Sequence, residues 1–174
     1  MKTIKFILFM TSIISLISIV VPMVMGQPIV LDFANESINS DTQIHVKGDV
    51  IQPLKKFNFN EGNWSAYLII GRNDKDELPK EMPSGLRFKT EDKVLLKEIQ
   101  QWKFIYTEGD IATVESEFIL YQNGKQVFKS GIVLNKENQG FQSKQYGWLQ
   151  VSPNGTLTKQ CKQFKKVNWP ILFR

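Results

Sequence analysis

Cysteine and histidine are almost absent from this sequence of 174 residues: Cys161 is the only cysteine and His45 the only histidine. A single cysteine excludes an internal disulfide, and one cysteine with one histidine cannot complete a closed zinc site. The sequence also lacks the acidic spacing of an EF-hand and the G-x-S-x-G motif of a serine hydrolase. We therefore expect no metal, no cofactor and no catalytic residue, and a fold that is stabilised by packing alone.

The lone Cys161 has two interpretations. A free cysteine is commonly a small, buried apolar side chain. In an oxidising compartment it can instead form an intermolecular disulfide with a second chain. The sequence leaves both open.

Long apolar runs are also absent beyond the first 26 residues. Two lysines precede an apolar run over residues 6–21, which Pro22 is expected to end, and Gly26 offers the small residue that a signal peptidase requires. We expect residues 1–26 to be a cleaved signal peptide and the protein to be secreted. The alternative is an uncleaved signal anchor, because about 20 apolar residues suffice to span a membrane. No membrane span is expected in the remaining chain.

Neither sign of charge is in large excess. Residues 27–174 carry 20 basic and 17 acidic side chains, a net charge of about +3, which is ordinary for a soluble domain. We expect no nucleic-acid partner. The stretch Asn73–Ser84 is rich in charge and contains Pro79 and Pro83, so it is predicted to be a solvated loop.

A local basic excess lies near the C-terminus, where apolar and aromatic residues follow it. One interpretation is a solvated lysine face followed by a last strand that docks into the core. The other is a patch that holds an acidic polysaccharide, an anionic lipid or another protein. The lysines are Lys159, Lys162, Lys165 and Lys166.

Short segments rich in β-branched and aromatic residues recur along residues 27–174, separated by turn-forming residues. This pattern predicts an all-β fold, a single antiparallel β-sandwich-like domain, with a small β-barrel as the alternative. The predicted strands are 29–33, 43–46, 64–70, 86–89, 102–107, 113–120, 127–134, 146–151 and 156–164.

Two turns are predicted. Asn123 and Gly124 are typical of a type I′ hairpin turn, which would pair Leu120 with Val127 and Ile119 with Phe128. A second turn, Ser152-Pro153-Asn154-Gly155, would lead into the strand over residues 156–164.

Residues 90–106 allow a helix or a strand. Thr90 would cap a helix that places Leu95, Ile99 and Trp102 on one face. The alternation of apolar residues also fits a strand, which we favour.

Three N-x-S/T sequons are candidate N-glycosylation sites: Asn154, Asn35 and Asn63. Asn154 lies in a predicted turn, and Asn35 lies in a polar stretch. Asn63 precedes the bulky Trp64, which is expected to hinder modification.

Gly62-Asn63-Trp64 resembles the G-x-W motif that opens the first strand of lipocalins. The resemblance covers these three residues alone, and the disulfide of that family has no counterpart here. It implies a barrel that carries a small ligand, and this carrier is our first alternative function.

Glu115 and Glu117 are two residues apart, so a strand would place them on one face, as the paired carboxylates of a hydrolase would be. A carboxylate-dependent hydrolase is our second alternative function. The favoured interpretation is a solvent-facing pair balanced by lysines of a neighbouring strand. The function we expect is that of a secreted, non-enzymatic glycoprotein whose surface binds a glycan or a cell-surface protein.

Overall fold

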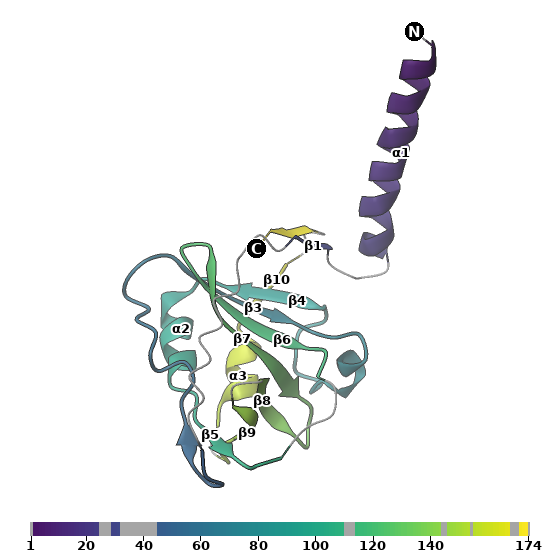
Figure 1. Cartoon of the computed structure of the whole chain (residues 1–174). Helices are drawn as coiled ribbons and strands as arrows, with labels where there is room; N and C mark the ends of the chain where they lie inside the picture. The colour runs from purple at the N-terminus through teal and green to yellow at the C-terminus, as the bar shows by residue number, and fades with distance from the viewer. Residues whose placement is uncertain are drawn as a thin grey trace. The chain divides into compact units, whose positions relative to one another are not determined.

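The structure is a computed structural model that describes residues 2–24, 29–31, 45–109, 114–143, 146–153, 155–167 and 171–173. Strands predominate over helices in these ranges (Figure 1). The helical elements are α1 (Lys2–Val24), η1 (Asp74–Glu77), α2 (Lys93–Gln100) and α3 (Leu157–Cys161). The strands are β1 (Ile29–Leu31), β2 (Val50–Ile51), β3 (Trp64–Ile69), β4 (Arg87–Thr90), β5 (Phe104–Tyr106), β6 (Glu117–Gln122), β7 (Lys125–Leu134), β8 (Gln139–Ser143), β9 (Gly147–Val151), β10 (Lys165–Lys166) and β11 (Ile171–Phe173).

The chain divides into two compact units, and the first consists of Met1–Phe33 and Asn168–Arg174. In this unit β1 pairs with β11 in parallel. Helix α1 continues two residues past Pro22, so the expected end of the helix at that proline is wrong. Counting only the residues that the structure describes, no helix is long and apolar enough to cross a membrane. The boundary after residue 26 stays a prediction.

The second unit, Ala34–Val167, contains a nine-stranded sheet in the order β10-β4-β3-β6-β7-β8-β9-β5-β2. Every pairing in this sheet is antiparallel. Among the described residues the end strands β10 and β2 do not pair with each other, so the sheet stays open. The predicted all-β, sandwich-like fold is confirmed, and the barrel alternative is wrong.

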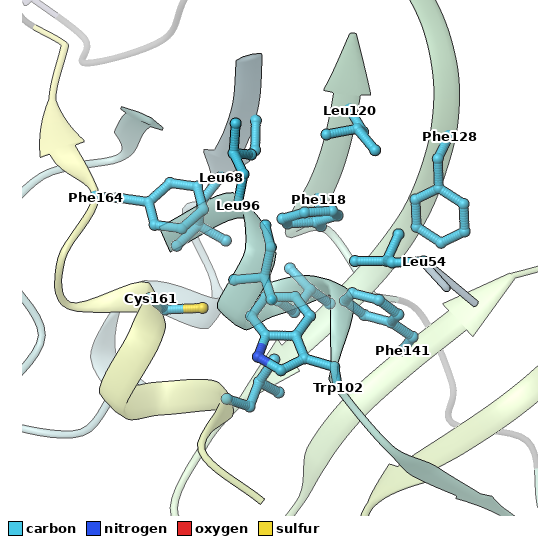
Figure 2. Close-up of a cluster of buried hydrophobic side chains, with 14 of the residues drawn as sticks. Leu54, Leu68, Leu96, Trp102, Phe118, Leu120, Phe128, Phe141, Cys161 and Phe164 are labelled. Carbon is cyan, nitrogen blue, oxygen red and sulfur yellow. The ribbon is translucent and has the colours of Figure 1, made fainter. Parts of the chain in front are cut away.

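One aromatic core joins distant parts of this sheet. Ile51 from one end strand and Phe88 from near the other end belong to the same buried cluster, so the sheet must curve around it. Figure 2 shows side chains from β3, β6, β7, β8, α2 and α3 converging there. Burying one such large apolar side chain contributes about 1.5–3 kcal/mol. Packing is therefore the source of stability, as the scarcity of cysteine implies.

The hairpin between β6 and β7 has the predicted turn, because Asn123 and Gly124 both adopt positive φ, 51° and 77°. The predicted register is wrong. Leu120 lies opposite Phe128, because the pairing shifts between Leu120 and Tyr121. This irregularity leaves one extra residue in β7 and turns Leu120 and Phe128 toward the same core.

Residues 93–100 form α2, so the strand favoured for this segment is wrong. The cap is Asp92, whose Oδ1 accepts hydrogen bonds from the backbone N–H groups of Val94 (2.8 Å) and Leu95 (3.4 Å). Thr90 is the last residue of β4 instead. The buried residues of α2 are Leu95, Leu96 and Ile99.

Residues 157–161 form α3, so the strand predicted over 156–164 is also wrong. Leu157, Gln160 and Cys161 are all buried, and a strand would turn the adjacent Gln160 and Cys161 to opposite faces. The carbonyl of Ser152 accepts a hydrogen bond from the N–H of Gly155 at 2.6 Å, closing a turn before the helix.

Most other predicted strands are confirmed within a few residues. The strand expected over 113–120 starts only at Glu117. The strand expected over 43–46 has no counterpart in its described part, and the strand that follows is β2. Residues 45–49 form a turn instead, in which the N–H of Val46 donates to Oδ2 of Asp49 at 2.8 Å.

Candidate functional site

Of the three candidate glycosylation sites, Asn35 and Asn154 lie outside the described residues, and Asn63 lies immediately before β3. The Asn63 side chain is exposed. Its backbone is fixed against the hairpin turn, because its N–H donates to Oδ1 of Asn123 at 2.9 Å and its carbonyl accepts from the N–H of Asn123 at 2.7 Å. The acceptor amide is therefore presented from an anchored turn.

Trp64, next to this acceptor, points into the protein. Its side chain is buried, with the ring 4.7 Å from that of Phe59, and its indole N–H donates to the carbonyl of Glu61 at 2.7 Å. The indole is thus held away from the exposed Asn63 side chain. The same tryptophan begins β3, an inner strand of an open sheet, which differs from the closed barrel that the G-x-W resemblance implies.

Cys161 is fully buried on α3. Burial raises the pKa of its thiol well above the ordinary value, because the thiolate would lose its hydration. This placement supports the interpretation as an apolar thiol. A disulfide with a second chain would require α3 to leave the core.

The two candidate carboxylates have different partners. Glu117 on β6 forms a 2.8 Å ion pair with Lys129 of β7, the neighbouring strand. Glu115 lies before the strand, and its Oε1 accepts a 2.6 Å hydrogen bond from the side-chain amide of Asn73. The balance of Glu117 by a neighbouring-strand lysine is confirmed, whereas the common strand face for both carboxylates is wrong because β6 starts at Glu117.

The predicted loop Asn73–Ser84 is attached to the domain at its first turn. Asp74 accepts hydrogen bonds from the backbone N–H (2.8 Å) and hydroxyl (2.6 Å) of Ser116. Pro79 and Met82 are buried. The loop is thus only partly solvated, and these contacts fit a structural connector.

A cluster of three rings near β5 was not predicted. His45 lies 5.8 Å from Tyr106 and 5.7 Å from Tyr146, measured between ring centroids. Nε2 of His45 is buried and has no hydrogen-bond partner among the described residues. These residues are far apart in the sequence and belong to no shared motif, so no sequence pattern predicts that their rings lie together.

The lysines of α3 and β10 lie beside a second basic segment. Strand β10 pairs with β4, and α3 contacts α2, so residues 157–166 run alongside residues 87–100. We call the lysines of these two segments, apart from Lys89, the basic corner. Its members are Lys93, Lys97, Lys159, Lys162, Lys165 and Lys166.

Lys89 lies on β4, in register with Lys165 of β10. Its ammonium forms a 2.6 Å ion pair with Glu91 and lies 5.3 Å from the centroid of the Tyr67 ring. Burial acts to lower the pKa of Lys89, but hydrogen bonds to Glu91 and Tyr67 outweigh it and the pKa is raised. Burial lowers the pKa of Arg87 on the same strand.

No family model, no curated protein and no solved structure matches the chain.

Proposed function

We propose that this protein is a secreted glycoprotein that acts by binding a glycan or a cell-surface protein at its surface. The N-terminal apolar segment with its small residue at Gly26 supports secretion. The exposed Asn63 within a sequon supports glycosylation.

The packing of the interior is the observation that carries the surface-binding proposal. Phe104 and Phe118 each stack on Phe141, with ring centroids 4.7 Å and 5.4 Å away. Trp102 lies edge-on to the same three rings. A small-ligand carrier uses an apolar cavity at this place in its fold, whereas here aromatic rings occupy the space between the strands. Recognition is therefore assigned to the outer surface.

Binding arrays test the proposal directly. The mature protein, purified from the medium of secreting cells, is applied to immobilised glycans and to a panel of cell-surface ectodomains. We expect saturable binding to one class that survives removal of the protein's own glycans. Retention of a small apolar ligand, or hydrolysis of glycans that depends on Glu115 or Glu117, would instead support the carrier or the hydrolase.

A further inference from the structure

The basic corner concentrates positive charge that its own neighbourhood does not neutralise. Five of its six lysines are exposed and Lys162 is half-buried. Across the described part of the chain, none of the six has a carboxylate within ion-pair distance. The two segments also contain three acidic residues, Glu91, Asp92 and Glu98.

Each of these three carboxylates already has a local partner. Glu91 pairs with Lys89 at 2.6 Å. The side chain of Asp92 caps α2 by accepting hydrogen bonds from the backbone N–H groups of Val94 and Leu95. Glu98 accepts a 3.4 Å hydrogen bond from the amide of Gln160 on α3. Only the bond to Glu98 crosses between the two segments, and none of the three carboxylates pairs with a lysine of the corner, so those lysines remain available to an external anion.

The register of β10 places two lysines in directly opposed positions. Lys165 lies directly opposite Lys89 across the β10–β4 pair. Like charges in directly opposed positions destabilise a sheet. Glu91 already pairs with Lys89 at 2.6 Å, so the lysine of this opposed pair that has no carboxylate partner among the described residues is Lys165.

A simpler account explains part of the pattern. Lysines on an end strand prevent another sheet from pairing with its free edge, and Lys165 and Lys166 both lie on the end strand β10. This account does not extend to Lys93 and Lys97 on α2 or to Lys159 on α3, because helices present no such edge.

The chemistry of the surface selects the type of anion. Lysines spread over two helices and a strand match charges repeated along a chain. Among the described residues of the two segments, Val94 is the only exposed large apolar side chain, too little for insertion into a lipid surface. We propose that the basic corner binds a linear anionic polysaccharide through its sulfate or carboxylate groups. The proposal rests on the proposed function, because secretion is what exposes the surface to such polymers.

Heparin serves as the probe, with affinity measured at low salt and elution followed in a salt gradient. Lys165→Gln/Lys166→Gln and Lys93→Gln/Lys97→Gln are the test variants. The matched control is Lys75→Gln/Lys136→Gln, which removes the same charge from two exposed lysines outside the corner. We expect each test pair to weaken binding about tenfold and to elute at lower salt, with the control unchanged.

Several results would overturn the polysaccharide assignment. Equal losses in the test and control variants would show that net charge alone is responsible. Binding to vesicles containing phosphatidylserine without binding to heparin would assign the corner to a membrane surface. If heparin does not bind but a neutral glycan or a protein on the arrays does, the polysaccharide assignment fails and the proposed function still holds. If neither heparin nor any molecule on the arrays binds, both the polysaccharide assignment and the proposed function are wrong.

Discussion

At the scale of the residue, Asn63 and Trp64 show how one turn gives two neighbours opposite environments. Asn63 is exposed, whereas Trp64 is buried with 6% of its surface accessible. Gly62, at φ 81°, adopts the left-handed conformation that allows the chain to enter β3 in this way. The expectation that Trp64 hinders modification of Asn63 rests on the size of the indole alone. The sequence does not reveal that the indole points into the protein, away from the Asn63 side chain.

We therefore predict that Asn63 is glycosylated when the protein is secreted. Endoglycosidase treatment of wild-type protein should lower its mass, and Asn63→Gln should lower the initial mass by one glycan. After both proteins are deglycosylated, Asn63→Gln and wild type should have the same melting temperature, because the turn is held through the backbone of Asn63. Asn35→Gln and Asn154→Gln serve as comparison variants. An unchanged mass for Asn63→Gln would show that this sequon is not used.

At the scale of the element, α2 depends on its first turn. A helix of eight residues is short, and Asp92 satisfies backbone N–H groups that would otherwise lack partners. Replacing such a cap with alanine costs about 0.5–2 kcal/mol. We predict that Asp92→Ala lowers the free energy of unfolding by an amount in this range, measured by urea titration. Asp92→Asn should restore most of the loss, and equal losses in both variants would argue against a capping role.

Elements were predictable where the signal is local. The Asn123-Gly124 turn follows from two residues that tolerate positive φ. The register of the β6–β7 hairpin could not be predicted from these two residues, because the bulge beside Leu120 depends on which side chains meet in the core. Helix α2 was missed because its apolar residues fit both periodicities. Helix α3 was missed because Gln160, an apparent surface residue, is buried against Trp102 and Thr156.

At the scale of the whole molecule, topology decides what the sequence pattern leaves open. The lysines of residues 159–166 form a visible basic run in the sequence, but only the β4–β10 pairing and the contact between α2 and α3 bring residues 87–100 beside them. The ring cluster around His45 likewise arises from segments far apart in the chain. Composition predicted the fold class, whereas the basic corner and the ring cluster depend on contacts between distant segments.

The second unit also shares one core between both ends of its sheet and the helices α2 and α3, so it should unfold as a single cooperative unit. Phe141 is the test, because its ring contacts those of Trp102, Phe104, Phe118 and Phe128. Phe141→Ala should lower the free energy of unfolding by about 3–5 kcal/mol through lost burial and the cavity left behind.

The matched control is Val94→Ala, whose side chain is 68% exposed and should change stability by no more than about 0.5 kcal/mol. Helix and sheet signals in circular dichroism and tryptophan fluorescence should give coincident transitions in wild type, since Trp64 on β3, Trp102 between α2 and β5 and Trp148 on β9 are buried in separate parts of the second unit. A fluorescence transition that precedes the loss of secondary structure would show that the helices and the two ends of the sheet are stabilised independently, contrary to a shared core.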